Sequence, residues 1–212
     1  MTTFFTSDLH LGHQNIITYT NRPFSSVEEM NEGLINNWNG VVSNDDDVYI
    51  LGDLCMGKIN ETLPLVELLK GNKKLIPGNH DRCWFGGKPK GREEWVKKYK
   101  DVGLEILGNG VDEGCGVVDL SHLFPGEKVE GCHFPFYGDS QNGDRYSAYR
   151  PVDKGQFLLH GHTHSNETFF EEDGDNILTK MIHVGVDSSD LRPLNISNIN
   201  SAIQTIKIMR GE

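Results

Sequence analysis

The chain lacks the features that mark membrane-spanning and disulfide-stabilised proteins. Its longest apolar runs, such as residues 48–51, are far too short to cross a bilayer. The start of the sequence has neither the basic segment nor the long apolar stretch of a secretory signal, so we expect a cytoplasmic protein with no membrane partner. No C-x-x-C pair occurs, which favours free thiols over a zinc knuckle or a redox pair for Cys55, Cys83, Cys115 and Cys132.

Basic charge is also scarce. Lys and Arg number 20 against 31 Asp and Glu, and the formal net charge is -11. This balance argues against a broad basic surface that would bind a nucleic-acid polymer strongly. It does not exclude nucleotides, because two bound divalent cations would cancel part of the negative charge. The composition does not indicate an oligomeric state.

Internal repeats, low-complexity tracts and linkers rich in proline and serine are absent as well. We therefore expect one domain over residues 1–212, with one substantial core. Hydrophobic residues make up 36% of the chain and charged residues 24%, a balance typical of a soluble globular protein rather than a disordered one.

Short strand-like runs organise the chain, and each ends in a polar motif. Four such runs are residues 2–7, 48–51, 74–76 and 156–159. The motifs that follow them are Asp8, Gly52-Asp53, Pro77-Gly78-Asn79-His80-Asp81 and His160-Gly161-His162-Thr163-His164. Four strands therefore deliver metal-binding residue types at their carboxyl ends.

Helix signals lie between these runs. Ser25 or Ser26 can cap a helix whose apolar residues fall on one face, namely Val27, Met30, Leu34 and Trp38. Residues 92–100 predict a more exposed helix. A further helix is predicted over residues 61–70, with Gly71 as its stop signal and with Leu65, Leu68 and Leu69 facing the core.

The alternation of strands and helices in the first half indicates an α/β layer arrangement. Residues 104–186 offer mostly strand-like segments and glycine turns, so a second sheet packed on the first is the simplest continuation.

Two short motifs place metal-binding side chains two residues apart. In Asp8-Leu9-His10, residues i and i+2 of an extended backbone point to the same side, so both side chains can reach one ion. His162-Thr163-His164 repeats this spacing, but its two imidazoles would reach neighbouring ions if the backbone turns. A mixture of carboxylate, amide and imidazole ligands suits transition metals such as Mn, Fe, Zn or Ni.

Three single residues extend this set. Asp53 follows Gly52, where the chain can turn sharply, and its two carboxylate oxygens can bridge two ions. Asn79 offers an uncharged oxygen, and His133 offers a nitrogen from the end of a strand that a proline terminates. Each motif alone is a weak signal, but their occurrence together predicts a single site.

These motifs resemble those of the calcineurin-like metallophosphoesterase family, in particular its small single-domain members in bacteria and phages. The resemblance covers residues 2–190 and is carried by 7–13, 21–24, 52–53, 78–81, His133 and 161–164. It implies an α/β fold in which a two-sheet β-sandwich is flanked by helices in four layers, α/β/β/α. It also implies a location in a bacterium or in a phage-infected host cell.

By matching positions, the resemblance implies two divalent transition-metal ions, with manganese favoured. One ion would be bound by Asp8, His10, Asp53 and His164, and the other by Asp53, Asn79, His133 and His162. Two cations about 3.5 to 4 Å apart can hold a bridging hydroxide and stabilise the attacking and leaving oxygens of a phosphate ester.

Other residues are assigned by their neighbourhood. His80 is implied to act on the substrate, as a proton donor to the departing oxygen or as a ligand of a phosphoryl oxygen. Asp81 either orients His80 or only hydrogen-bonds backbone amides. His13 either touches the substrate or caps a helix that begins near Gln14.

Residues 135–154 predict a long surface loop of the kind that often carries function. Its Arg145 and Arg150 can bind phosphate through paired guanidinium contacts, or they are solvated loop charges.

Three histidines compete for roles in the site. His122 follows a strand-like run, but His133 is preferred as the ligand because its proline spacing matches the family. His160 is expected to be packed or to support the ligands, and so is His183.

Together these features predict a phosphodiesterase that acts on a small nucleotide or cyclic nucleotide. The short chain, the acidic balance and the lack of a capping domain favour a small substrate. A phosphomonoesterase or protein phosphatase is the first alternative, and a nuclease the second. A metal-binding scaffold without activity is disfavoured, because no ligand position of the family is missing.

Overall fold

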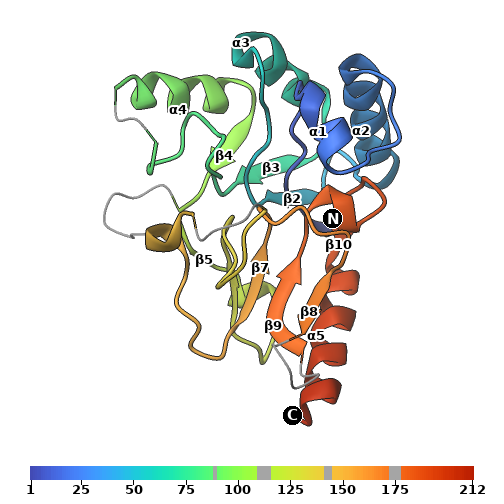
Figure 1. Cartoon of the computed structure of the whole chain (residues 1–212), viewed down its shortest axis with the longest axis vertical. Helices are drawn as coiled ribbons and strands as arrows, with labels where there is room; N and C mark the ends of the chain where they lie inside the picture. Colours follow the sequence, from blue (N-terminus) through green and yellow to red (C-terminus); the bar gives the residue numbers. More distant parts are fainter. Residues whose placement is uncertain (88–89, 109–115, 141–144, 172–177) are drawn as a thin grey trace.

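Two five-stranded sheets form the centre of the molecule (Figure 1). The computed structural model describes residues 1–87, 90–108, 116–140, 145–171 and 178–212. The first sheet has the order β10-β1-β2-β3-β4, in which β1 to β4 run parallel and β10 is antiparallel. Its strands are β1 (Thr3–Thr6), β2 (Asp47–Ile50), β3 (Asn72–Leu75), β4 (Leu104–Ile106) and β10 (Leu194–Asn195).

The second sheet comes from the later part of the chain. Its order is β5-β6-β7-β9-β8, with β6, β7 and β9 parallel and the two edge strands antiparallel. Its strands are β5 (Val118–Asp119), β6 (Val129–Gly131), β7 (Phe157–His160), β8 (Phe169–Glu171) and β9 (Leu178–His183). The predicted second sheet is confirmed, and with it the two-sheet sandwich flanked by helices.

The first sheet is buried on both faces. In β1, Phe4 joins a core beneath the helices, whereas Phe5 joins a core shared with the second sheet. In β2, Ile50 joins the core beneath the helices and Tyr49 joins the core shared with the second sheet. Successive side chains of a strand point to opposite faces, so β1 and β2 each contribute to both cores. This double burial fixes the strand ends that carry the polar motifs.

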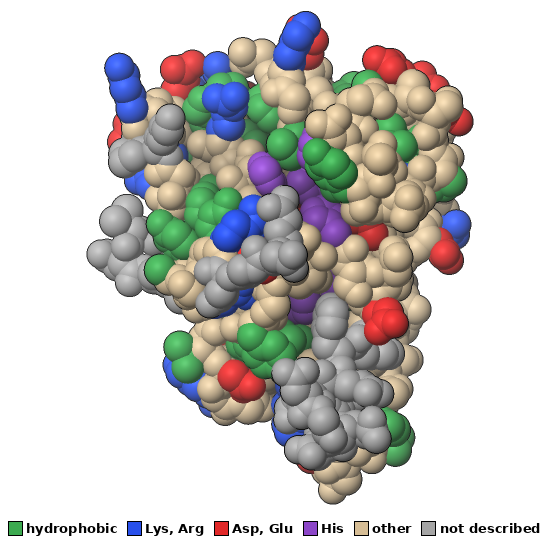
Figure 2. Space-filling view, in the orientation of Figure 1, with side chains coloured by type: hydrophobic (Ala, Val, Ile, Leu, Met, Phe, Trp, Pro, Cys, Tyr) green, Lys and Arg blue, Asp and Glu red, His purple; other side chains and the backbone are tan. Residues whose placement is uncertain are grey.

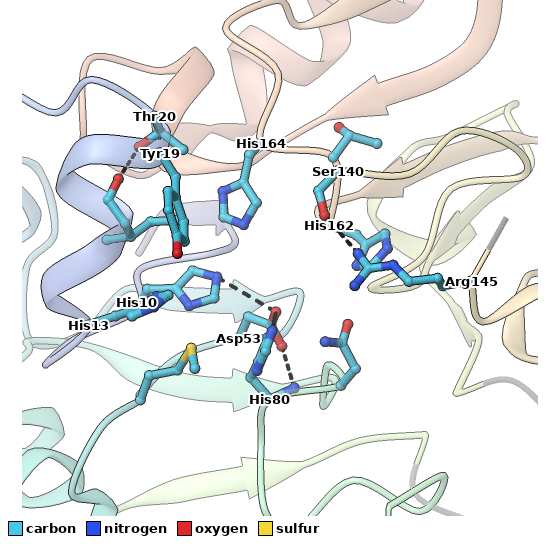
Figure 3. Close-up of a pocket in the computed structure, with 14 residues that line it drawn as sticks. His10, His13, Tyr19, Thr20, Asp53, His80, Ser140, Arg145, His162 and His164 are labelled. Atoms are coloured by element: carbon cyan, nitrogen blue, oxygen red, sulfur yellow. Dashed lines mark hydrogen bonds and ion pairs between the residues drawn. The ribbon is translucent and has the colours of Figure 1, made fainter. Parts of the chain in front are cut away.

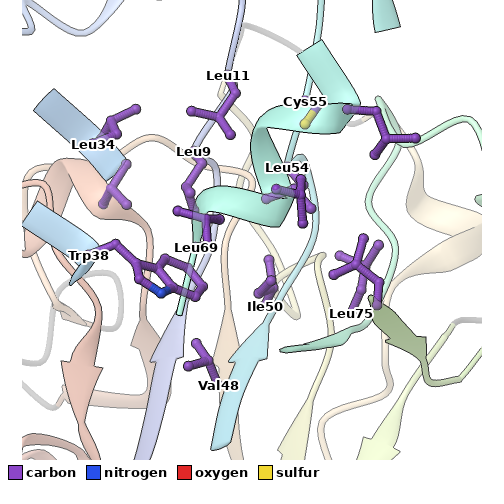
Figure 4. Packing of buried hydrophobic residues seen from close by; sticks show 14 of the residues in the cluster. Leu9, Leu11, Leu34, Trp38, Val48, Ile50, Leu54, Cys55, Leu69 and Leu75 are labelled. Carbon is purple, nitrogen blue, oxygen red and sulfur yellow. The ribbon is translucent and has the colours of Figure 1, made fainter. Parts of the chain in front are cut away.

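Helices of the first half cover one face of this sheet: α1 (Gln14–Tyr19), α2 (Val27–Val41), α3 (Ile59–Thr62) and α4 (Arg92–Asp101). Leu34 and Trp38 of α2 belong to the same buried cluster as Val48 of β2, and Figure 4 shows Trp38 between Leu69 and Val48. Ser26 caps α2 by accepting a hydrogen bond from the amide of Glu29. The helices predicted after Ser26 and over residues 92–100 are confirmed.

Residues 59–68 differ from the predicted single helix. α3 ends at Thr62, and a 3-10 helix, η1 (Leu63–Leu68), follows with Pro64 in its first turn. A 3-10 helix has about three residues per turn, so Leu63, Val66 and Leu69 align on one side, and all three are buried. Leu68 is 57% exposed. The prediction that Leu68 faces the core is wrong, because it applied α-helical spacing to a 3-10 segment.

A fifth helix, α5 (Ile196–Arg210), is not among the predicted ones. It runs alongside the sheets toward the C-terminus (Figure 1) and packs Ile199, Ile203 and Ile206 into the core between them. Asn195 caps the helix through a reciprocal pair of hydrogen bonds with Asn198. This cap and the isoleucine spacing are signals that the sequence carries.

An aromatic cluster covers part of the second sheet. The ring of Trp84 lies 5.7 Å from Phe134, 5.8 Å from Tyr146 and 4.8 Å from Tyr149. Leu158 of β7 and Met181 of β9 pack in the same cluster. The two tyrosines belong to the predicted 135–154 loop, whose residues 141–144 lie outside the described residues. Ring packing therefore fastens the described part of this loop to the sheet.

The described helices and cysteines agree with a chain that has no membrane-spanning helix and no disulfide among its described residues. No helix in the described parts of the chain combines the length and the apolar character that a membrane span requires. Cys55, Cys83 and Cys132 are buried as thiols, and Cys115 lies outside the described residues.

The register of η1 predicts that two adjacent leucine substitutions differ strongly in their effect on stability. Leu69→Ala is expected to destabilise the fold by about 2–5 kcal/mol, because a buried leucine leaves a cavity. Leu68→Ala is expected to change stability by no more than about 0.5 kcal/mol, because the side chain is exposed. Urea unfolding of both variants measures the difference, and equal losses would contradict the 3-10 register.

Candidate metal centre

The carboxyl ends of strands from both sheets converge on one hollow, where histidine side chains are visible on the surface (Figure 2). In parallel sheets this edge is the usual place for ligand sites. The residues that follow β1, β2, β3, β6 and β7 include Asp8, His10, Asp53, Asn79, His133, His162 and His164. The fold therefore brings together the seven predicted ligands from distant parts of the chain.

Five of these residues adopt left-handed backbone. Their φ angles are 58° for Asp8, 52° for His10, 52° for Asp53, 70° for His162 and 52° for His164. This conformation costs a non-glycine residue about 1–2 kcal/mol. Such strained positions cluster at functional sites, and here they turn the side chains inward just after a strand ends.

Glycines beside the ligands allow the motifs to approach one another closely. Gly52 has a φ of +91°, and a Cβ at this position would lie 2.6 Å from the Nδ1 atom of His133. A Cβ at Gly161 would overlap the side chains of Ser7 and Asp8. Any larger residue at either position would force the ligand motifs apart.

The two oxygens of Asp8 have different environments. Oδ2 accepts a hydrogen bond of 3.0 Å from the backbone amide of His162. Oδ1 faces the Nε2 atoms of His10 and His164, at 3.8 and 3.9 Å. Burial would raise the pKa of Asp8, but the two imidazoles hold it well below its usual range. One oxygen is thus anchored, and the other is turned toward two imidazoles.

Asp53 repeats this division at the centre of the site. Oδ1 accepts a hydrogen bond of 2.9 Å from the backbone amide of His80. Oδ2 lies 3.6 Å from His10 Nε2 and 3.4 Å from His133 Nε2. The single atom Oδ2 therefore faces imidazoles on both sides, whereas the sequence analysis expected both oxygens to take part in bridging.

His133 is oriented by its backbone contact. Its Nδ1 lies 2.8 Å from the carbonyl of Leu51, which fixes the donor at that nitrogen and leaves Nε2 to point at the site. Nε2 is 3.1 Å from the side-chain oxygen of Asn79. Burial lowers the pKa of His133, but nearby Asp53 outweighs this and raises it to about 9.

His164 is held by a pair of residues that the sequence analysis missed. Its Nδ1 lies 2.9 Å from Oδ2 of Asp187, and the buried Arg22 donates to both oxygens of Asp187 at 2.8 and 3.1 Å. Arg22 also donates to the carbonyls of Asp8 and Leu9. No spacing rule connects these positions, although Arg22 stands in the family-like segment 21–24.

The donor set fits a metal. Several buried polar atoms at the site have no hydrogen-bond partner in the described part of the chain, including Asp8 Oδ1 and both ring nitrogens of His10. Leaving such atoms unpaired is costly, and a cation would satisfy them. Two clusters place ligand atoms within 4.8 Å of one another, Asp8-His10-His164 and Asp8-Asp53-His133.

His80 and Asp81 are adjacent in sequence but differ in environment. The side chain of His80 is 43% exposed, and its Nε2 lies 4.0 Å from Oδ2 of Asp53. Asp81 is buried and accepts hydrogen bonds from the amides of Asp53, Leu54 and Gly78. Burial and the charge of Asp53 raise the pKa of Asp81 to about 7. Of the two roles considered for Asp81, the structure shows the hydrogen bonds to backbone amides.

A pocket of about 570 Å³ opens over these residues. Figure 3 shows His13 and Tyr19 on one side, Ser140 and Arg145 on the opposite side, and His80 at the lower edge. His13 precedes α1 without a side-chain capping bond, and burial lowers its pKa to about 4. A small ligand in this pocket would meet both walls.

The two arginines of the 135–154 loop are not equivalent. Arg145 is exposed, lines the pocket and lies 2.6 Å from Asp139. Arg150 is buried, and it donates to the carbonyls of Pro135 and Arg145 at 3.4 and 3.2 Å. Asp139, which the sequence analysis did not single out, lies 3.3 Å from His162 Nε2. Arg150 therefore supports the loop, whereas Arg145 can reach a ligand.

The remaining histidines lie outside this arrangement of ligands. His122 is exposed on a 3-10 helix, η2 (Ser121–Leu123). His160 is buried, with Nδ1 2.8 Å from the carbonyl of Gly161, and its ring lies 5.4 Å from that of His183. Nδ1 of His183 lies 3.2 Å from the hydroxyl of Ser188. His160 and His183 are thus packed next to the ligand-bearing strands, as expected.

Several known proteins resemble this chain along most of its length. The gene 66 protein of Mycobacterium phage L5 is 33% identical over 201 residues, covering 88% of this chain and 86% of its own. An uncharacterized protein of Methanocaldococcus jannaschii is 33% identical over 209 residues, covering 98% and 94%. A protein of unknown function from Aquifex aeolicus, known from a crystal structure, shares the fold with a TM-score of 0.61 at 22% identity, over 95% of this chain and 98% of its own.

Family membership follows from the sequence match and agrees with the geometry. Residues 1–166 match the calcineurin-like phosphoesterase family, and this range contains all seven predicted ligands. Members of this family typically bind two divalent metals and hydrolyse phosphate esters. The chain therefore belongs to the calcineurin-like phosphoesterase family.

Proposed function

We propose that this protein is a cytoplasmic phosphodiesterase that uses two divalent transition-metal ions, manganese being favoured, to hydrolyse a small nucleotide or cyclic nucleotide. Asp8, His10, Asp53 and His164 would hold one ion, and Asp53, Asn79, His133 and His162 the other. The proposal rests on one observation above all, which is the position of Asp53 Oδ2 between the Nε2 atoms of His10 and His133. A carboxylate oxygen with an imidazole on each side suits a bridging ligand.

The bound cations would neutralise charge on the phosphate and lower the pKa of a water molecule. The protein's own residues bind and orient the substrate. His80 Nε2 is the atom that would hold a proton for the leaving oxygen, because the exposed ring borders the pocket close to Asp53. Asp81 keeps the turn of Asp53 and Gly78 in place through three backbone amides, so we assign it to positioning rather than to proton transfer.

The pocket walls support a small anionic substrate. Arg145 is the pocket residue suited to a phosphoryl oxygen, and the ion pair with Asp139 holds its guanidinium in place. His13 and Tyr19 form the opposite wall, where an aromatic or sugar group would pack. A volume of about 570 Å³ lies in the ordinary range of small-molecule sites.

A chromogenic assay tests the activity directly. With Mn(II), the protein is expected to hydrolyse bis(p-nitrophenyl) phosphate faster than p-nitrophenyl phosphate, and excess EDTA is expected to abolish both rates. A faster monoester rate would favour a phosphomonoesterase or protein phosphatase, and release of nucleotides from single-stranded DNA or RNA would favour a nuclease. The absence of turnover with every divalent metal would contradict the enzyme proposal.

Replacing His80 separates catalysis from metal binding. His80→Ala is expected to lower kcat about 10²- to 10⁴-fold, the usual contribution of a general acid, while both metals remain bound. Metal content per protomer and kcat are measured on the same preparation. His122→Ala serves as the control, because that side chain is exposed away from the pocket. Loss of metal together with activity would instead make His80 a ligand.

Asp187 is expected to tune the metal site through His164. Asp187→Asn removes the negative charge at His164 Nδ1 and weakens the pair with Arg22, so metal affinity is expected to fall about 10- to 100-fold. Competition with a fluorescent chelator measures this affinity without any substrate. Asp190→Asn, an exposed change nearby, is the control. Equal metal affinity in both variants would show that Asp187 has only a structural role.

A further inference from the structure

A second cavity, of about 390 Å³, lies next to the pocket of the metal centre. The two cavities have Met56, Asn79 and His80 in both of their walls. His80 is therefore positioned at their junction, with its ring exposed to ligands. A substrate whose phosphorus sits over Asp53 would extend past His80 into one cavity or the other.

The second cavity carries positive charge. Arg82 and Lys90 line it, and both are exposed. The guanidinium of Arg82 lies 5.1 Å from the centre of the Trp95 ring, a cation–π contact that limits its motion. The ammonium of Lys98 lies over the same ring at 4.3 Å, outside the cavity wall, and is paired with Glu94 at 2.9 Å. Arg82 and Lys90 are thus the cationic residues of this wall, on a chain whose formal net charge is -11.

The acidic residue in this wall does not cancel that charge at the surface. Asp81 is buried, and its oxygens are occupied by the backbone amides of Asp53, Leu54 and Gly78. Among the described residues that line the cavity, Asp81 is the sole carboxylate. An anion entering the cavity would therefore meet Arg82 and Lys90 with no exposed carboxylate in its wall.

We infer that this second cavity binds an anionic group carried by the leaving group of the substrate, such as a second phosphate or a carboxylate. The inference rests on the proposed function and narrows it to phosphate esters with a charged leaving group. Hydrolysis forms a bond from the water oxygen to phosphorus and breaks the bond to the leaving oxygen, which takes a proton from His80. His80 borders both cavities, so it can donate this proton at their junction. The departing group then lies in the second cavity, and the phosphate that stays lies in the first, where Arg145 faces it.

Two chromogenic esters that differ in leaving-group charge test the inference. They are p-nitrophenyl methyl phosphate and its analogue with a carboxylate ortho to the nitro group, compared by kcat/KM at constant ionic strength with Mn(II). In the wild type the ratio of charged to uncharged ester is set partly by Arg82 and Lys90. In the double variant Arg82→Gln/Lys90→Gln this ratio is expected to fall roughly tenfold, as expected for two weak ion pairs.

The matched control is Lys97→Gln/Lys100→Gln. It removes the same amount of charge from exposed positions of α4 that do not line the cavity, so the ratio is expected to stay at the wild-type value. Thermal melts check that both double variants are folded. An unchanged ratio in Arg82→Gln/Lys90→Gln, or an equal fall in the control, would overturn the inference.

A binding measurement separates this inference from the proposed activity. If the wild type hydrolyses neither ester, the proposed function fails, and calorimetric titration of the EDTA-treated protein with inorganic phosphate decides the second question. Affinity that falls about tenfold in Arg82→Gln/Lys90→Gln but not in the control supports an anion site in the cavity. Equal affinities in the wild type and both double variants would reject it.

Discussion

Hydrogen bonds between the strand-end motifs hold the whole site in place. The amide of Asp8 donates to the carbonyl of Gly52, and the amide of His10 donates to that of Asp53, each at 3.0 Å. Carboxylate oxygens of the same two aspartates then accept from the amides of His162 and His80. These motifs therefore depend on one another, and their hydrogen bonds offset the left-handed backbone of five ligands, which costs each of those five about 1–2 kcal/mol. The spacing of the ligands is set by the backbone before any ion arrives.

This arrangement buries the charged carboxylates of Asp8 and Asp53 away from water, which is unfavourable for a charged group. Asp8 and Asp53 are buried, and burial alone would raise the pKa of both. Neighbouring imidazoles keep both carboxylates ionised, and bound cations would complete the balance of charge and hydrogen bonds. The buried pair of Arg22 and Asp187 has a related role, because it neutralises itself while orienting His164 and the Asp8 turn. The site thus resembles a preformed cavity for positive charge, maintained by supports outside the ligand set.

Local sequence signals predicted the parts of the protein that depend on local geometry. The strands before Asp8 and Asp53 and the helix after Ser26 follow from short-range pattern, and they were predicted correctly. The contact of Asp187 with His164 joins residues 23 positions apart, with β8 and β9 between them, and the contact of Arg22 with Asp187 joins residues 165 positions apart. No periodicity encodes such pairs. The prediction that Leu68 faces the core was wrong for another reason. Residues 63–68 form a 3-10 helix with Pro64 in its first turn, and this helix aligns other residues on its buried side than an α-helix would.

Charge distribution explains how an acidic protein can attract an anionic substrate. At physiological ionic strength, charges separated by more than about 8 Å are largely screened, so the net charge of the surface matters less than the groups lining the pocket. Two divalent ions would outweigh the charges of Asp8 and Asp53, and Arg145 adds to this field from one wall. Arg82 and Lys90 extend the field beyond His80. Positive potential would then be confined to the path of the substrate, whereas the acidic remainder would repel long nucleic-acid chains.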